Sequence, residues 1–308
     1  MSQQERPTRL TRRQALAGLG AAAAVAAPRR VLAGPRAPME EPDLRAVRVP
    51  PPVPATDPDS PVWARARPIE VAVIGQAMVL PWKMKPSVSA LRARAVHDGR
   101  QIAFLLEWND PRPETLSIKT DQFKDGCAVL LAPHPAPPLA WMMGTSEVAV
   151  TLVHWRADWQ RDIDAGFQDL EVAFPNVAFD FYPPLVGVKH PPRLPAAYPP
   201  AARKWLPGWH VGNPLSQPAR RSPVEKLRAT GPGTVEQLPT QDALGRGRWR
   251  DGTWKVALAR NLKAGGGTEV ALAPGGTYAV AFAVWAGGER DVGARKSVTR
   301  MGRLRLQR

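Results

Sequence analysis

Two adjacent methionines precede a glycine and a predicted strand in the segment AWMMGTSEVAVTLVHW, which spans residues 140–155. A methionine side chain is flexible and polarizable, so Met142 and Met143 could fill gaps in an apolar core. Its thioether sulfur is also a ligand for soft metals. The residues alone therefore leave two interpretations open, core filler or metal ligand.

Other side chains with catalytic potential are sparse. The five histidines are isolated, and no Gly-x-Ser-x-Gly or His-Glu-x-x-His motif occurs, which argues against a hydrolase. The single cysteine, Cys127, lies in the apolar segment DGCAVLLAP and is expected to be a buried small hydrophobe. The sequence has no Cys-x-x-Cys-His motif and no cysteine cluster, which excludes a covalent c-type haem and an iron–sulfur cluster.

The amino-terminal residues have the composition of an export signal. The segment TRLTRRQALAGLGAAAAVAAPRRVLAG has a basic start, an Ala/Gly-rich apolar stretch and a small-residue exit. The apolar stretch is too short to span a membrane. The pair Arg12-Arg13 resembles the twin-arginine motif, which predicts a signal peptide over residues 1–33 and a periplasmic location. That route carries folded proteins, often with a cofactor already bound, so it favours a redox protein.

The charge is strongly basic but dispersed. The chain carries a formal charge of +15, and its first 33 residues contain six arginines and one glutamate, so about +10 remains on the rest. Lysine and arginine form no run longer than two after the signal. This pattern favours solvation or docking to an acidic partner, not nucleic-acid binding. No later stretch of about 18 apolar residues occurs, so no membrane span is expected.

The periodicity predicts an all-β fold. Alternating segments separated by turn residues occur at 69–80, 87–110, 125–133, 146–155, 234–239, 245–262, 275–288 and 289–308, with Asp-Gly turns at 98–99 and 251–252. Together with 35 prolines, they predict an antiparallel β-sandwich with long Pro-rich loops and a few short helices. The sandwich is expected over residues 62–308, after a Pro-rich leader at 34–61.

Residues 156–222 form a long, aromatic and Pro-rich segment, which predicts an ordered functional cover. The following SPVEKLRAT predicts a short helix, with Ser222 as its N-cap and Pro223 in its first turn.

Several segments in a fixed order carry a family resemblance. They are IAFLLEWND after Asp98-Gly99, DQFKDGCAVLLAP, WMMGTSEVAVTLVHWRADWQRDID, GWHVGNPLS, SPVEKLRATGPGT, DGTWKVALAR and YAVAFAVWAGGERDVGARKSVT. Over roughly residues 62–306 the chain resembles the ethylbenzene-dehydrogenase-like haem-binding family. Its members are the haem b (gamma) subunits of periplasmic type II molybdoenzymes of the DMSO reductase family.

The resemblance implies one non-covalent haem b whose iron is ligated by Met143 and Lys296, with Met142 and His154 as alternates. A lysine can ligate only as the neutral amine, so its proton must be displaced. Two protein ligands leave no open iron position, which suits electron transfer and not oxygenation. Trp209 and His210 in GWHVGNP are further candidates for cofactor contacts.

The implied function is a non-catalytic electron-transfer subunit in a complex with a molybdopterin catalytic subunit and an iron–sulfur subunit. A soluble c-type cytochrome is a further candidate partner. Two alternatives remain open: a stand-alone periplasmic b-type cytochrome that serves another redox partner, and a carbohydrate-binding-like β-sandwich module without haem. The eleven tryptophans make the second alternative reasonable, because aromatic platforms bind sugars.

Overall fold

The computed structural model describes residues 41–168, 170–177, 204–217, 219–266 and 269–308. Residues 41–308 form one compact unit. The predicted signal peptide lies outside the described residues, as does most of the Pro-rich part of the long 156–222 segment.

Strands are the main regular secondary structure of the described chain. They are β1 (Asp43–Arg48), β2 (Ile69–Ala72), β3 (Ile74–Gly75), β4 (Ala90–His97), β5 (Gln101–Asn109), β6 (Gly126–Pro133), β7 (Val150–Arg156), β8 (Val224–Ala229), β9 (Glu236–Gln237), β10 (Leu244–Arg250), β11 (Thr253–Asn261), β12 (Thr277–Trp285), β13 (Ser297–Val298) and β14 (Gly302–Leu306). The helices are short: η1 (Pro61–Arg65), α1 (Ala157–Ala165), α2 (Leu170–Ala173), α3 (Pro207–His210), η4 (Pro214–Ser216) and η5 (Gly287–Glu289).

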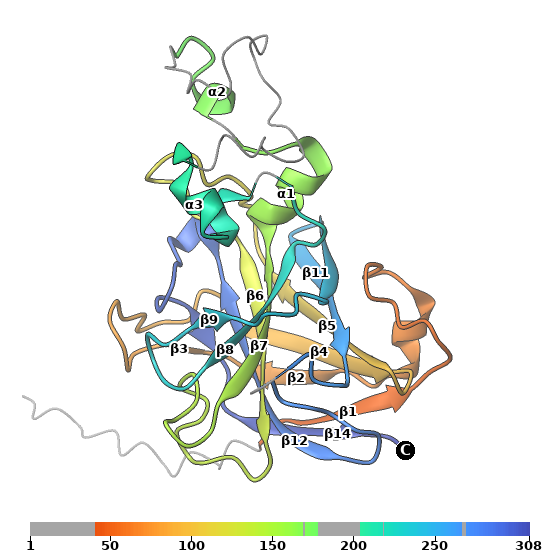
Figure 1. Ribbon diagram of the computed structural model, residues 1–308. Coiled ribbons are helices and arrows are strands. Elements are labelled where there is room, and N and C mark those ends of the chain that lie inside the picture. Colours follow the sequence, from red (N-terminus) through yellow and green to blue (C-terminus); the bar gives the residue numbers. More distant parts are fainter. Residues whose placement is uncertain (1–40, 169, 178–203, 218, 267–268) are drawn as a thin grey trace, which may run out of the picture. The chain divides into compact units, whose positions relative to one another are not determined.

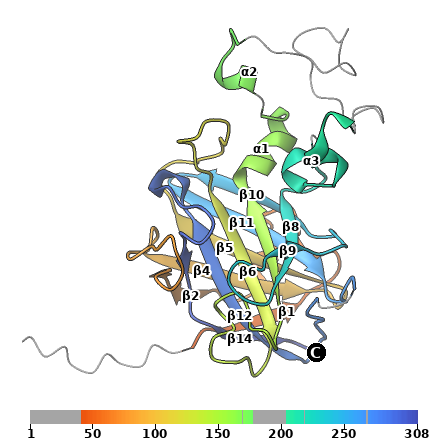
Figure 2. The same cartoon turned by 60° about the vertical axis from the view of Figure 1, so that its left-hand side comes forward.

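The strands are hydrogen-bonded in the order β10-β11-β5-β4-β1-β14-β12-β6-β7-β8-β9, and β2, β3 and β13 pair at the margins. Neighbours are antiparallel except β1, which is parallel to both β4 and β14. The β10–β4 half and the β12–β9 half face one another, so one continuous sheet forms two layers (Figures 1 and 2). This confirms the predicted β-sandwich class and adds a parallel strand that the sequence pattern does not indicate.

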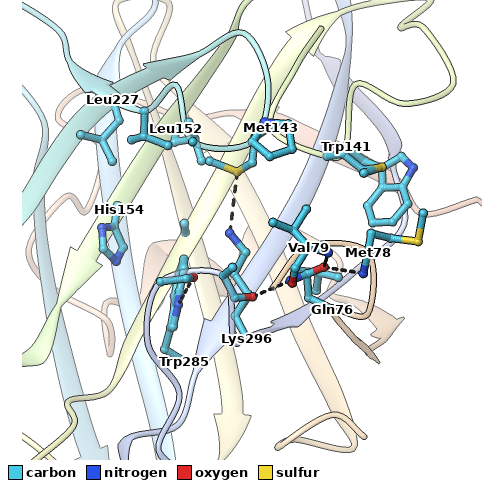
Figure 3. Close-up of a pocket in the computed structure, with 18 of the residues that line it drawn as sticks. Gln76, Met78, Val79, Trp141, Met143, Leu152, His154, Leu227, Trp285 and Lys296 are labelled. Atoms are coloured by element: carbon cyan, nitrogen blue, oxygen red, sulfur yellow. Dashed lines mark hydrogen bonds between the residues drawn. The ribbon is translucent and has the colours of Figure 1, made fainter. Parts of the chain in front are cut away.

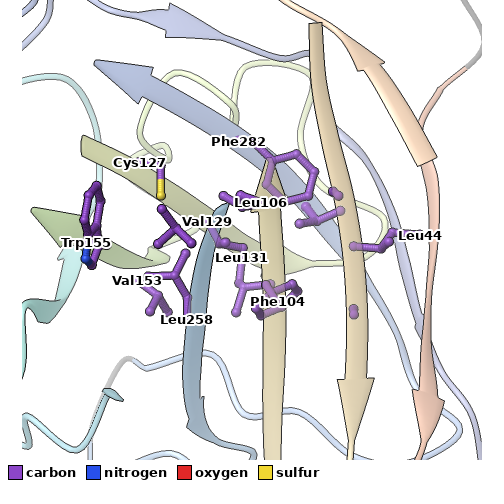
Figure 4. Packing of buried hydrophobic residues seen from close by; sticks show 14 of the residues in the cluster. Leu44, Phe104, Leu106, Cys127, Val129, Leu131, Val153, Trp155, Leu258 and Phe282 are labelled. Carbon is purple, nitrogen blue, oxygen red and sulfur yellow. The ribbon is translucent and has the colours of Figure 1, made fainter. Parts of the chain in front are cut away.

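The main core lies between the two layers. Phe104 and Leu106 of β5 pack with Leu258 of β11 against Val129 of β6 and Val153 of β7 (Figure 4). All five side chains are fully buried. Cys127 belongs to the same cluster, and burial raises the pKa of its thiol, as expected for a small hydrophobe.

Both predicted Asp-Gly turns are present. Gly99 joins β4 to β5 with φ of 91°, and Asp251-Gly252 joins β10 to β11 with φ of 49° and 75°. Positive φ at both central positions, as at Asp251-Gly252, is what a type I′ hairpin turn requires, whereas in the turn between His97 and Gln101 only Gly99 has it.

Two predicted elements are wrong. The sandwich does not begin near Val62, because β1 at 43–48, within the predicted leader, pairs with β4 and β14 on its two sides. The predicted helix after Ser222 is strand β8, which pairs with β7 from Val150 to Trp155. Ser222 still caps locally, since its hydroxyl accepts the Val224 N–H at 3.2 Å, but sheet pairing overrides the helix signal.

The central position of β1 gives a stability prediction. Leu44 is 0% exposed and belongs to the main core. Leu44→Ala should therefore lower the free energy of unfolding by about 2–5 kcal/mol, because it removes buried methyl groups and leaves a cavity. Urea unfolding of the variant measures this. Arg45→Ala, an exposed neighbour on the same strand, is the control and should stay within about 0.5 kcal/mol of the parent. Equal stability of both variants would contradict the strand assignment.

Candidate functional site

A cavity of about 480 Å³ lies on the outer face of the β12–β6–β7–β8 layer, on the side away from the core. This volume is in the range of small-molecule and cofactor pockets. Its lining is mostly apolar (Figure 3). The lining residues are Gln76, Met78, Val79, Leu80, Ala128, Trp141, Met142, Met143, Leu152, His154, Glu225, Leu227, Pro232, Gly233, Val235, Trp285, Gly293, Ala294, Lys296 and Val298.

The floor of the cavity follows from strand alternation. Ala128 of β6, His154 of β7 and Glu225 of β8 stand side by side in register. Successive side chains on a strand point to opposite faces, so these residues point outward while Val153 and Trp155 point into the core. The same strands thus supply both the core and the cavity floor.

One wall is the turn that precedes β7. Met143 has φ of 76°, in the left-handed region, and its carbonyl accepts the Gly231 N–H at 2.9 Å. Gly144 follows with φ of 88°, and a Cβ there would lie 2.7 Å from the Ala229 carbonyl oxygen and 2.8 Å from that of Val148. Only glycine fits this position, so the Met-Gly pair fixes the turn that aims the Met143 thioether into the cavity.

The opposite wall is the segment that leads into β13. The Lys296 carbonyl accepts the Gln76 N–H at 3.1 Å, and the Gln76 amide donates to the Ala294 carbonyl at 2.9 Å. The Gln76 side-chain oxygen in turn accepts the N–H groups of Met78 and Val79. Gln76 therefore ties the loop that follows β3 to the backbone that carries Lys296.

Lys296 projects into the cavity toward Met143. Its Nζ lies 3.7 Å from the Met143 Sδ and 4.9 Å from the Trp285 ring centroid (Figure 3). The side chain is 9% exposed. No carboxylate of the described residues lies within ion-pair distance of it, in contrast to buried Lys83, which pairs with Asp291. Burial lowers the pKa of Lys296 to about 8 because nothing nearby compensates the charge.

A second polar group lies on the floor. His154 Nδ1 is 2.9 Å from Glu225 Oε1, and Gln237 donates to Glu225 Oε2 at 3.0 Å. The His154 ring lies 4.9 Å from the Trp285 ring, centroid to centroid. Hydrogen bonding to His154 holds the pKa of Glu225 below its usual value although burial opposes this. His154 is thus already engaged through one nitrogen.

The structure brings Met143 and Lys296 together and places both alternates, Met142 and His154, on the same cavity. Strand alternation does not separate the two methionines, because residues 138–143 form turns and β7 begins only at Val150.

Trp209 and His210 are not brought to the cavity. They belong to α3, which lies near α1 (Figures 1 and 2), where Arg220 links Pro214 to Asp162. Neither is part of the candidate site.

Gln76, Trp285 and Glu225 are site residues that the sequence does not indicate. Gln76 lies within a predicted strand, and Trp285 is one of eleven tryptophans. Gln76 acquires its role through the pairing of β3 with β13, Trp285 through that of β12 with β6, and Glu225 through that of β8 with β7. Across the part of the chain that the structure describes, no three His, Cys, Asp or Glu side chains gather to hold a metal ion. No helix in the same part is long and apolar enough to cross a membrane.

Family comparison agrees with the resemblance in the sequence. The family model described as ethylbenzene dehydrogenase matches residues 60–171 and 228–297, more than half of the chain. The matched segments include Gln76, Met143, Trp285 and Lys296. The chain belongs to this family.

One curated relative is the "Putative respiratory nitrate reductase heme subunit ORF7" of Haloferax mediterranei, 21% identical over 244 residues. The match covers 79% of this chain and 65% of the relative, so the chain spans less than two thirds of that protein's length.

Among solved structures, the chain is similar to a carbohydrate-binding module of family 9 from Caldicellulosiruptor kristjanssonii, in complex with glucose or with cellotriose. The TM-scores are 0.39 and 0.40 and the identities 9% and 10%. The matches cover 86% of this chain and 96% and 94% of those chains. So slight a likeness carries no conclusion about ligands.

The Lys296 amine, which has no carboxylate partner among the described residues, predicts how the free energy of unfolding depends on pH in the protein without added cofactor. The Lys296 pKa is about 8 in the folded state, whereas an unfolded chain gives lysine about 10.4. Between these values the unfolded chain binds more protons, so the free energy of unfolding should rise with pH and level off above the unfolded pKa. The rise is at most roughly 3 kcal/mol, at 1.36 kcal/mol for each pKa unit.

Urea unfolding of the parent and of Lys296→Gln across this pH range checks the prediction. Glutamine keeps a polar side chain but cannot titrate, so the parent should show a rise that the variant lacks. Parallel pH profiles for the two proteins would contradict an uncompensated buried lysine.

Proposed function

We propose that this protein is a periplasmic haem b-binding electron-transfer subunit of a molybdenum-containing oxidoreductase complex. The observation that carries the proposal is the approach of the Lys296 amine to the Met143 thioether at 3.7 Å within a mostly apolar cavity. Membership of the ethylbenzene dehydrogenase family supports it, as does the relative whose name describes a haem subunit.

The donor set fits an iron that is ligated from both sides. Metal–sulfur and metal–nitrogen bonds of roughly 2.3 Å and 2.0–2.1 Å, as known for zinc, add up to about 4.3–4.4 Å. The two atoms lie 3.7 Å apart, so they would separate by about 0.6–0.7 Å to hold one metal ion between them. The lysine needs a free lone pair, and a pKa of about 8 makes loss of its proton far easier than in water. A metal ligand requires a buried amine whose lone pair is available. A lysine that formed a structural ion pair with a carboxylate would stay protonated and could not bind a metal.

The cavity lining also suits a porphyrin better than a sugar. A sugar site needs several hydrogen-bonding groups that are free to meet hydroxyls. The Gln76 amide nitrogen donates to two backbone carbonyls, and His154 is hydrogen-bonded to Glu225. What remains is largely aliphatic, aromatic and thioether surface, as in Leu152, Leu227 and Trp285. The carbohydrate-binding alternative is therefore the weaker one.

Haem b bound between Met143 and Lys296 would supply one-electron chemistry. The thioether is neutral and soft, so it favours the ferrous state and raises the potential. The mostly apolar walls would offer water few hydrogen-bond partners beside the haem. If Met143 and Lys296 both held the iron, little room would remain for oxygen or a substrate to bind it, which supports electron transfer and not catalysis at this site.

A molybdopterin catalytic subunit and an iron–sulfur subunit are the partners we propose, with a soluble c-type cytochrome as a further electron carrier. The name of the Haloferax relative, a respiratory nitrate reductase subunit, supports membership in such a complex. The export signal predicted over residues 1–33 supports a periplasmic location.

The ligand pair is tested with purified, haem-loaded protein. The parent should contain about one haem b that acid acetone extracts, since no Cys-x-x-Cys-His anchors it. Lys296→Ala should open an iron position and make the reduced protein bind carbon monoxide. Lys296→Arg should not restore the parent spectrum, because a guanidinium stays protonated.

The matched methionine variants separate the ligand from its neighbour. Met143→Ala should strip the haem or lower its potential by on the order of 100 mV, within the range of about 0.8 V that axial ligands span. Met142→Ala should change neither property. Visible spectra and potentiometric titration measure both effects. A folded, haem-supplied protein that stays colourless would sink the proposal.

Export is tested separately. Replacement of both Arg12 and Arg13 by lysine should leave the precursor in the cytoplasm, because the twin-arginine pathway reads that pair. Cell fractionation and immunoblotting measure the distribution. Normal periplasmic accumulation of the double variant would refute this export route and leave the haem site untouched.

A further inference from the structure

We infer that an exposed apolar surface beside the cavity mouth is a docking surface for an acidic electron-carrier protein. This rim surface consists of Met78, Leu80, Trp82, Met84 and Val292. The inference rests on the proposed function, since it says where electrons enter or leave the haem.

Exposed large hydrophobic side chains are concentrated at this place. The described residues contain thirteen of them, and seven lie on the segments that form the cavity or adjoin it: Met78, Leu80, Trp82, Met84, Leu139, Val235 and Val292. The others are spread over α1, α2, β10 and the α3–η4 region. Scattered exposed hydrophobes are normal, but a cluster of this kind marks an interaction site.

The segment Trp82-Lys83-Met84 shows an inverted burial pattern. Lys83 is 4% exposed, whereas Trp82 and Met84 are 54% and 75% exposed. The lysine is turned inward to Asp291, with Nζ 2.7 Å from Oδ1, and its own N–H donates to the Gln76 carbonyl at 2.6 Å. The fold thus turns the charged side chain inward and holds two large apolar side chains in water on an anchored segment. Such exposed apolar surface is typical of an interaction site.

The anchoring connects the rim surface to the haem ligand. Asp291, which holds Lys83, lies in the segment that continues to Lys296, and the Arg295 guanidinium donates to the Trp82 carbonyl at 3.1 Å. Met78 and Leu80 are both exposed and part of the cavity lining. A protein seated on this surface would therefore sit directly at the cavity mouth, and a rigid surface loses little entropy on docking.

The charges beside the rim surface indicate the chemistry of the partner. Lys85 and Arg290 are exposed and Arg295 is half-buried, whereas the acidic groups on the same segments are exposed Glu289 and buried, paired Asp291. An apolar centre with a basic margin is complementary to a partner with an apolar centre and an acidic margin. Such charges steer association and make it fall with ionic strength. The transfer itself moves one electron, with no bond or proton change.

Plastocyanin, an acidic blue copper protein, is a suitable probe. Its redox-inactive cadmium form should bind the haem-loaded protein at low ionic strength and lose affinity as salt is added, as measured by titration calorimetry. The double variant Met84→Gln, Lys85→Glu should weaken binding about tenfold, because it removes an apolar contact and reverses a steering charge. The rate at which the reduced protein converts Cu(II) plastocyanin to Cu(I) should fall in parallel.

The matched control is Val211→Gln, Lys263→Glu. Val211 is 77% exposed, close to the 75% of Met84, and both control residues lie outside the cavity lining. The inference would be overturned if the control lost as much affinity for plastocyanin as the Met84 variant, or if the Met84 variant lost none. Equally tight binding of basic mitochondrial cytochrome c would also overturn it. So would salt-independent dimerisation through the rim surface with no plastocyanin binding. Haem content is measured in the same preparations: a haem-loaded protein that fails to bind refutes the docking surface alone, and a colourless one refutes the proposed function.

Discussion

A buried amine without a counter-charge is the constraint around which this site is built. Three lysines are buried in the described part of the chain, and two of them meet carboxylates: Lys83 with Asp291, and Lys226 with Glu269 and Asp242. Lys296 meets a thioether and an indole ring. Desolvation without compensation is unfavourable for a protonated lysine, so the arrangement stabilises the neutral amine, the form that can bind a metal.

That arrangement requires rigid walls, because a flexible lysine would turn toward solvent. Pairing of β13 with β3 and β12 fixes the backbone after Lys296, and Gln76 fixes it before. On the opposite side, the Met143 turn depends on Gly144, where any side chain would collide with two backbone carbonyls. The walls come from residues about 150 positions apart, and only the closed sandwich brings them together.

The sequence predicts those features that local rules determine. Alternation and Asp-Gly turns predict the strands and both hairpins, because period and turn chemistry are local. It does not predict β1, whose partners lie far along the chain, nor β8, where a capping signal at Ser222 is overridden by pairing with β7. In the site, the juxtaposition of Met143 and Lys296 agrees with the family resemblance, whereas Gln76 and Trp285 have no local signature. Both Met142 and Met143 line the cavity, because the chain turns at these residues and strand alternation does not separate their side chains.

The extent of the family match divides the molecule into shared and individual parts. The matched residues, 60–171 and 228–297, contain both proposed ligands, the Gln76 clamp and the segments of the rim surface. The unmatched residues 172–227 contain α3, with Trp209 and His210, and the first four residues of β8, of which Glu225 and Leu227 line the cavity. If members of the family bind a common cofactor, the proposed ligands Met143 and Lys296 and the residue that fixes the Lys296 backbone, Gln76, are expected to lie in the shared part, as they do. The cavity therefore combines residues of the shared part with Glu225 and Leu227 of β8, which the family match leaves out.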